Sequence, residues 1–246
     1  MFLAIKEMKH SKTRFLMIGA IIMLIAWLVF ILSGLGNGLS SLAAATMKNI
    51  DGDLFIYEEG SEGTMMKTKV SGTIADDIEG KYGVTEAAKF GQSTIIVKKD
   101  GPSNTAEKND VAFIGIDPGK FIEPKVTEGK QLTSEDKMGV IIDETLQEKG
   151  YEIGDTIDVT SSDLKLTVIG ITEGETFNHL PSVFVNVDTW QSYAFAAPGS
   201  DNGLESPVAM IALQGNNIDA QKIADKYNDI ETFSKSQAVH ALQVYQ

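Results

Sequence analysis

The chain has 246 residues, with 21 basic side chains against 34 acidic ones, a formal net charge of −13 at pH 7 and no cysteine. The lack of cysteine excludes disulfides, thiolate metal sites and cysteine nucleophiles. The acidic balance argues against nucleic acid as a partner, because nucleic-acid recognition requires basic surfaces.

The first predicted element is a long apolar helix. Residues 15–47 contain no charged side chain, and residues 15–32 read FLMIGAIIMLIAWLVFIL. A helix needs roughly 20 apolar residues to cross a bilayer. Ala43-Ala44-Ala45 resembles a signal-peptide cleavage site, but the apolar part of a signal peptide is only about 7–15 residues long. We therefore predict an uncleaved transmembrane helix, with its outer extension, over residues 15–47.

The charges on the two sides of this helix predict its orientation. Residues 1–14 carry one acid, Glu7, and four bases, which are Lys6, Lys9, Lys12 and Arg14. Positive charge next to a span stays in the cytoplasm, so residues 1–14 are predicted to form a cytoplasmic amphipathic helix. From residue 48 onward, 17 lysines face 33 carboxylates. We expect this acidic part to be a solvated domain outside the cell membrane.

Beyond residue 51, strand and helix signals alternate. Strands are predicted over residues 53–57, 94–98, 111–116, 140–142, 156–160, 164–172, 182–186 and 208–213. Helices are predicted over residues 73–82, 144–149, 188–195, 218–227 and 234–246, with Asp143 as the N-cap of the second. Mixed elements with short links predict an α+β fold, with a mixed α/β extracytoplasmic domain over residues 48–233. The last helix, over residues 234–246, is expected to lead toward a second span.

Motifs of catalysis are missing from the sequence. There is no G-x-x-x-x-G-K-[ST] loop to hold ATP phosphates, no G-x-S-x-G elbow and no H-E-x-x-H zinc motif. The three histidines, His10, His179 and His240, lie far apart, and His179 is expected in a loop. We therefore expect no enzyme activity, no catalytic residue, no metal site and no cofactor in this chain.

Several short motifs follow one another in an order that resembles a known family. Residues 128–133 read EGKQLT, and they are followed by GVIIDE at 139–144, GYEIGDTI at 150–157 and LTVIGI at 166–171. Together with the element at residues 112–118 and the basic head at residues 6–16, they resemble FtsX/MacB-type ABC transporter permeases. Lys130 stands where the family usually has arginine. The resemblance implies a MacB-like extracytoplasmic core domain after one transmembrane helix.

The resemblance also implies partners and a role. Such permeases pair as homodimers in membrane lipid and are driven by a separate cytoplasmic ATPase subunit that binds ATP. They have one span before the outer domain and three after it. The chain is therefore expected to be the N-terminal part of an efflux permease, truncated after its extracytoplasmic domain.

The segment at residues 30–39, FILSGLGNGL, resembles the HrtB haem-exporter and DevC-like branch of the family. This resemblance implies a hydrophobic or amphiphilic cargo, with haem as the leading candidate. The candidate axial ligands for haem iron near the membrane boundary, chosen by residue type, are Met47, Tyr57, Glu205 and Tyr245. Phe30 is a candidate for an apolar wall of the haem site. Each has an ordinary alternative role, since methionine fills cores, tyrosine anchors interfaces and glutamate is a common surface charge.

Two other roles remain open from the sequence. An FtsX-like scaffold would use ATP-driven movement of the outer domain to regulate a cell-wall hydrolase. A sensor would use the domain to bind a peptide antibiotic.

The charge asymmetry around the apolar helix gives a first testable prediction. A thiol reagent that cannot cross the membrane should label Ser103→Cys in intact cells and should leave Ser11→Cys unlabelled until the cells are opened, because residues 1–14 are expected in the cytoplasm. The natural chain contains no cysteine and serves as the blank. Labelling of position 11 but not of position 103 in intact cells would contradict the predicted orientation.

Overall fold

A computed structural model describes residues 12–43, 45–65, 68–100, 107–160 and 162–244. The chain divides into two compact units, Met1–Ser41 and Leu42–Gln246. The predicted amphipathic helix over residues 1–14 lies largely outside the described residues. The second unit begins before residue 48 and ends after residue 233, so it is wider than the domain range expected from the sequence.

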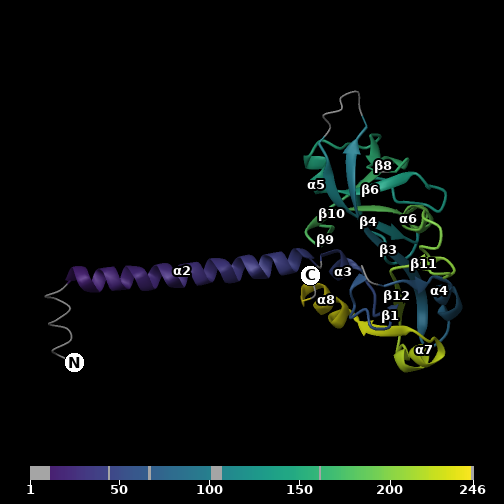
Figure 1. Cartoon of the computed structure of the whole chain (residues 1–246), viewed down its shortest axis with the longest axis horizontal. Helices are drawn as coiled ribbons and strands as arrows, with labels where there is room; N and C mark the ends of the chain where they lie inside the picture. Colours follow the sequence, from purple (N-terminus) through teal and green to yellow (C-terminus); the bar gives the residue numbers. More distant parts are fainter. Residues whose placement is uncertain (1–11, 44, 66–67, 101–106, 161, 245–246) are drawn as a thin grey trace. The chain divides into compact units, whose positions relative to one another are not determined.

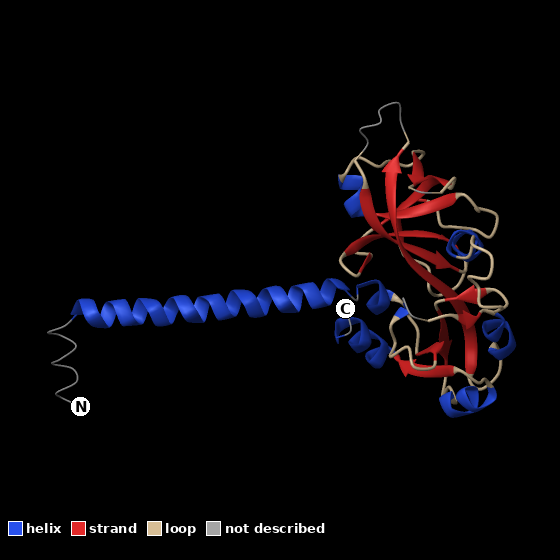
Figure 2. Ribbon diagram, in the orientation of Figure 1, coloured by secondary structure: helices blue, strands red, loops and turns tan. Residues whose placement is uncertain are grey.

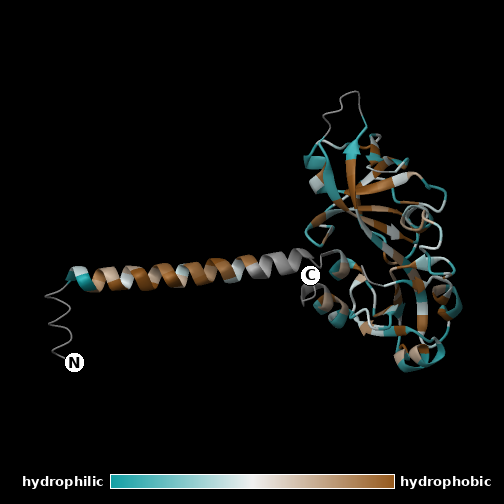
Figure 3. Ribbon diagram, in the orientation of Figure 1, coloured by the Kyte–Doolittle hydropathy of each residue, from teal (hydrophilic) through white to brown (hydrophobic). Residues whose placement is uncertain are grey.

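One helix, α2 (Lys12–Ala43), accounts for the described part of the first unit. Its 32 residues correspond to about 48 Å of helix. Over Lys12–Leu35 it is long and apolar enough to cross a membrane, and in Figure 3 the ribbon of this stretch is mostly brown after a teal start. The large apolar side chains on it are exposed, including Phe30 at 76%. Such a helix finds no core of its own in water and fits a lipid environment.

The second unit is built on an eleven-stranded sheet (Figure 1). Its order is β13-β1-β12-β3-β4-β10-β6-β8-β5, with β7 paired to β3 and β8, and β9 paired to β10. The strands are β1 (Leu54–Glu58), β3 (Val84–Lys99), β4 (Asn109–Ile116), β5 (Val126–Gly129), β6 (Gly139–Asp143), β7 (Thr156–Val159), β8 (Lys165–Thr172), β9 (Thr176–Phe177), β10 (Leu180–Asn186), β12 (Met210–Gly215) and β13 (Ile230–Ser234). A separate two-stranded pair joins β2 (Val70–Ser71) to β11 (Pro207–Val208).

The sheet is mixed and its middle is buried on both faces. β4 pairs parallel with β10, and β6 pairs parallel with β8, whereas the other pairs are antiparallel. Parallel strands are usually covered on both faces and therefore have near-continuous apolar sequences. This explains why all five residues of β6, GVIID, are buried.

Short helices cover the sheet (Figure 2). They are α3 (Ala45–Asn49), α4 (Thr73–Ile78), α5 (Glu144–Glu148), α6 (Val187–Ala194), α7 (Ala220–Lys226) and α8 (Lys235–Val244). Three of them begin at side chains that accept a hydrogen bond from a first-turn amide, namely Asp143, Asn186 and Asp219. These caps satisfy amides that lack a partner inside the helix, and the Asp143 cap predicted from the sequence is confirmed.

The core lies in three apolar clusters along the sheet. One cluster joins β6, β7 and β8 to α6, and another joins β1 and β12 to α4 and α7. The third, which we call the central cluster, contains Phe90, Ile114 and Phe184 and also Met47 from α3. Helix α3 is therefore part of the folded core of the second unit.

Trp190 of α6 fixes that helix on the sheet. Gly91 on β3 and Gly115 on β4 are register partners. A Cβ atom at Gly91 would lie 2.2 Å from the indole, and one at Gly115 would lie 2.5 Å from Cβ of Trp190. Glycine is required at both positions because the indole lies directly against the backbone.

The sequence prediction was wrong in several details. The predicted strand over residues 94–98 is only the end of the 16-residue β3, whose first half is rich in alanine and carries charges. Helix α4 ends at Ile78 rather than at residue 82, because Gly80 and Gly83 adopt positive φ. The strands β2, β5, β9 and β13 were missed, and β11 and β12 were predicted as one strand over residues 208–213. β2 and β9 have only two residues each, and β5 and β13 are mostly polar, so none of the four shows a clear apolar pattern.

The packing of α3 and α8 gives a prediction about the limits of the folded unit. A fragment of residues 42–246 should unfold cooperatively in denaturant. A fragment of residues 50–233 lacks Met47, Ala238 and Ala241, which are all buried. Loss of one large core side chain lowers the free energy of unfolding by about 2–5 kcal/mol. The shorter fragment should therefore be less stable by about 2 kcal/mol or more. Equal midpoints and equal slopes for the two fragments would contradict this packing.

Candidate functional site

The candidate site is the contact between α3 and the β9–β10 hairpin, which we call the α3 joint. It consists of Thr46 and Asn49 on α3, Asp143 at the end of β6, and Glu175 and Ser182 beside the hairpin. In the chain, α3 follows the apolar helix α2 after a single residue. The joint therefore holds the first helix after α2 against the β9–β10 hairpin.

Thr46 ties α3 to both sides of the hairpin. Its hydroxyl donates to the carbonyl of Thr176 at 3.1 Å and lies 3.3 Å from the hydroxyl of Ser182. Thr46 and Ser182 are buried. The hairpin turns through Asn178 and His179, which both have positive φ, as a type I′ hairpin turn requires. His179 is thus a turn residue, as the sequence predicted.

Glu175 is a buried carboxyl group in contact with Asn49 of α3. The side-chain amide of Asn49 donates to Oε1 of Glu175 at 2.8 Å. Glu175 is only 5% exposed, whereas Asn49 is exposed. Buried carboxylates normally have a cationic partner. Within the described part of the chain, Glu175 has no ion pair.

Asp143 is the second buried carboxyl group of the joint. Its Oδ2 accepts the backbone amide of Glu175 at 2.8 Å, while Oδ1 accepts the amide of Thr145. Both of its oxygens therefore act as acceptors, as expected of an ionised carboxylate. One side chain thus caps α5 and holds the start of the β9–β10 hairpin.

The electrostatics of Glu175 follow from this arrangement. Burial raises its pKa to about 7, from an ordinary value of 4.5. The hydrogen bond from Asn49 favours the charged form and lowers the pKa, whereas the neighbouring charge of Asp143 raises it. Glu175 therefore titrates near neutral pH in a contact that holds α3.

A different ion cluster lies at the surface between α4 and α7. Asp77 accepts hydrogen bonds from Lys226, Lys81 and Tyr227. The bond from Lys226 contributes most to lowering the pKa of Asp77. Exposed networks of this kind contribute little to stability. We regard this one as a link between two surface helices.

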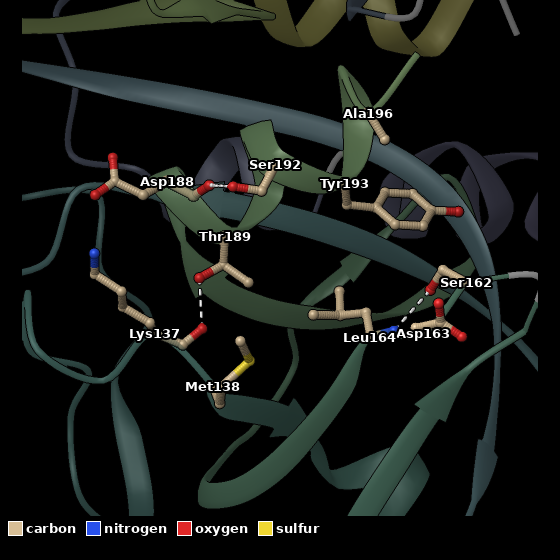
Figure 4. Close-up of a pocket in the computed structure, with 10 residues that line it drawn as sticks. All are labelled: Lys137, Met138, Ser162, Asp163, Leu164, Asp188, Thr189, Ser192, Tyr193 and Ala196. Carbon is tan, nitrogen blue, oxygen red and sulfur yellow. Dashed lines mark hydrogen bonds between the residues drawn. The ribbon is translucent and has the colours of Figure 1, made fainter.

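A shallow groove lies beside α6 (Figure 4). Its volume is about 420 Å³, and its apolar lining comes from Met138, Leu164, Tyr193 and Ala196. On its polar side, the hydroxyl of Thr189 donates to the carbonyl of Lys137 at 2.5 Å. The groove is large enough for one or two side chains of a ligand.

The five residues that the sequence suggested for a cargo site belong to different elements of the chain. Met47 and Tyr57 are completely buried in the central cluster. Phe30 lies on α2, Glu205 is exposed in the loop before β11, and Tyr245 lies outside the described residues. Among the described residues of the second unit, Met47 and Tyr57 share one cluster, and both pack the core there.

Tyr57 has an unusual environment for a phenol. Its ring meets Phe233 edge-on with centroids 5.4 Å apart. Its hydroxyl is buried with no hydrogen-bond partner among the described residues, and burial raises its pKa. A tyrosine that binds haem iron must be accessible and must lose its phenol proton, so Tyr57 could serve as a ligand only after the core opens.

Sequence reasoning missed Thr46, Asn49, Glu175 and Ser182. The one signal for Glu175 was its spacing from Phe177, since residues two apart on a strand share a face and Phe177 is buried. Glutamate is seldom buried. Its partner Asn49 is 126 positions away, beyond the reach of any local pattern.

Comparison with known proteins identifies the family. The profile of the MacB-like periplasmic core domain matches residues 15–226. The chain belongs to this family. The match extends from the start of the apolar stretch of α2 to the end of α7, so it includes most of both units.

Curated relatives of this MacB-like chain are ABC transporter permeases. It is 23% identical over 192 residues to the hemin transport system permease protein HrtB of Staphylococcus haemolyticus, covering 78% of this chain and 51% of that protein. It is 26% identical over 197 residues to an uncharacterized ABC transporter permease of Mycobacterium tuberculosis, covering 79% and 53%. The chain spans about half the length of these relatives.

Solved structures support the same fold. The periplasmic region of MacB from Actinobacillus actinomycetemcomitans superposes with a TM-score of 0.55 at 12% identity, covering 79% of this chain and 94% of that one. The extracellular domain of the noncanonic ABC-type transporter YknZ gives 0.52 at 15% identity, covering 74% and 99%. The prediction of an apolar helix followed by a MacB-like mixed α/β domain is therefore confirmed.

The titration of Glu175 gives a prediction about pH and stability. Because its folded pKa of about 7 exceeds the ordinary value of 4.5, the folded state binds more protons between these values. Its stabilising effect is complete below pH 4.5 and is lost as the pH rises through 7. The loss is at most about 3 kcal/mol.

The measurement is denaturant unfolding of the 42–246 fragment between pH 5 and 8. Glu175→Gln should be more stable than wild type at pH 8 and should show a flatter pH profile. Glu173→Gln is a matched control, since Glu173 is exposed. An unchanged profile in Glu175→Gln would show that Glu175 does not titrate in this range.

Proposed function

We propose that the chain is the N-terminal part of a permease subunit of an ABC efflux transporter. The family match over residues 15–226 is the observation that carries this proposal, because it joins an apolar helix to a MacB-like domain in one segment. The helix anchors the subunit in the cell membrane. Residues 1–14 lie in the cytoplasm and the second unit lies outside, following the positive-inside rule.

Energy for transport comes from a separate cytoplasmic ATPase subunit. The chain lacks a loop that could hold ATP phosphates, and its curated relatives are permeases. The permease acts as a homodimer in the lipid bilayer. In this arrangement ATP is bound by the partner, and the chain itself holds no cofactor.

Helix α2 and the α3 joint transmit the movement. α2 contains no proline among its 32 residues, so it lacks the commonest cause of a helix kink. Met47 anchors α3 in the central cluster, while Thr46 and Asn49 bind the hairpin and Glu175. A displacement of α2 in the cytoplasmic leaflet therefore pulls on β9 and β10, and through them on the sheet.

The cargo is a hydrophobic or amphiphilic compound, and haem is the leading candidate. Support comes from the HrtB-like residues 30–39 and from HrtB among the relatives. Haem partitions into membranes, and the exposed apolar side chains of α2, Phe30 among them, suit contact with such a compound. Among the suggested ligands, Glu205 is accessible without unfolding, whereas Met47 and Tyr57 are buried.

Haem tolerance tests this function. Deleting the complete gene should make cells sensitive to haem, and the intact permease with its ATPase should restore tolerance. The purified permease should shift the Soret band of haem, and Glu205→Ala should weaken the shift if Glu205 is an axial ligand. A Glu205→Gln variant separates loss of charge from loss of the side chain.

Two results would contradict the haem proposal when they occur together. They are unchanged haem tolerance in the deletion strain and no Soret shift with the purified permease. Division or cell-wall defects in that strain would then favour the scaffold role, and altered sensitivity to peptide antibiotics would favour the sensor role.

A further inference from the structure

We propose that Glu175 makes the α3 joint responsive to protons, holding α3 on the β9–β10 hairpin when the side chain is neutral and releasing it when the side chain is charged. This inference rests on the proposed function in one respect, which is that the α3 joint transmits movement from α2. It assigns to that joint a form of regulation by the pH outside the cell.

The geometry places a buried acid directly under the contact. Glu175 is 5% exposed, and Asn49 of α3 donates to its carboxyl group at 2.8 Å. Asn49 is itself exposed, so Glu175 lies one side chain below the solvent. If α3 moves away, water can hydrate the charged carboxylate of Glu175. Opening of the joint therefore removes the free-energy cost of burying that charge.

The carboxylate of Asp143 makes the charged form of Glu175 still less favourable. Asp143 accepts the amide of Glu175 and has both oxygens engaged as an anion. The charge of Asp143 adds to the effect of burial and helps to keep the pKa of Glu175 near 7. The two negative charges would lie side by side in the folded joint once Glu175 ionises.

Other charged groups belong to the elements around the joint. They are Lys48 on α3, Lys125 before β5, Glu144 in α5, Glu173 after β8 and His179 in the hairpin turn. Glu144 accepts the amide of Gly174 at 3.3 Å and so adds negative charge next to Glu175. Lys48, Glu173 and His179 are exposed, where solvent screens their charges.

The experiment is hydrogen–deuterium exchange of the full chain in lipid nanodiscs from pH 5 to 8, corrected for the intrinsic exchange rate. A carboxyl group that titrates at about 7 when buried and at 4.5 when exposed favours opening about 70-fold more at pH 8 than at pH 5. Protection of residues 45–50 and 174–182 should fall by up to that factor. Protection of β7 and β8 should stay higher than that of these two segments at every pH, because these strands exchange only when the whole unit unfolds.

Two variants make the result specific. Glu175→Gln should abolish the pH dependence in both segments. Asp143→Asn keeps a side chain that can cap α5 and should move the midpoint to lower pH, because one negative charge is removed. This second variant still tests the proposal if Glu175→Gln fails to fold.

Either of two outcomes would overturn the proposal. One is a flat pH profile of the joint in the wild-type chain. The other is the same degree of protection in the joint as in β7 and β8 at every pH, which would indicate exchange by global unfolding rather than by opening of the joint. The measurement uses neither haem nor ATP, so its outcome is independent of the haem-tolerance test.

Discussion

The insertion of α3 into the folded core is the interaction on which the rest depends. It fixes the segment that follows the apolar helix in the core of the second unit. Met47 fills the central cluster, and Thr46 and Asn49 add directed hydrogen bonds to the hairpin. Apolar contacts supply stability without direction, whereas the hydrogen bonds fix the orientation of the short helix. Both are needed for a helix of only five residues, which could not form alone.

Strand pairing links the β9–β10 hairpin to the rest of the second unit. β10 lies in the middle of the sheet and pairs with β4 on one side and β6 on the other. β3 connects both ends, since it pairs with β12 near its start and with β7 near its end. Trp190, packed on Gly91 and Gly115, holds α6 against this region. Densely packed interiors of this kind transmit displacement because they resist compression.

Much of this architecture was predictable from local sequence patterns, and the joint was not. The apolar helix, the cores of β1, β4, β6, β8 and β12, and the Asp143 cap follow from length, alternation and capping chemistry. The joint depends on contacts between residues more than 100 positions apart, such as Thr46 with Thr176. It also depends on Glu175 being buried, against the usual preference of glutamate. Exceptions of this kind are expected where a position serves function rather than stability.

Exchange measurements on the intact permease with its ATPase test transmission through the α3 joint most directly. A non-hydrolysable ATP analogue should change the protection of residues 174–186 in the wild type. The double variant Thr46→Val and Asn49→Ala should lose that change while still assembling with the ATPase. Ser192→Ala, which removes only a hydrogen bond within α6, should retain it. A nucleotide-dependent change of the same size in the double variant would contradict transmission through the joint.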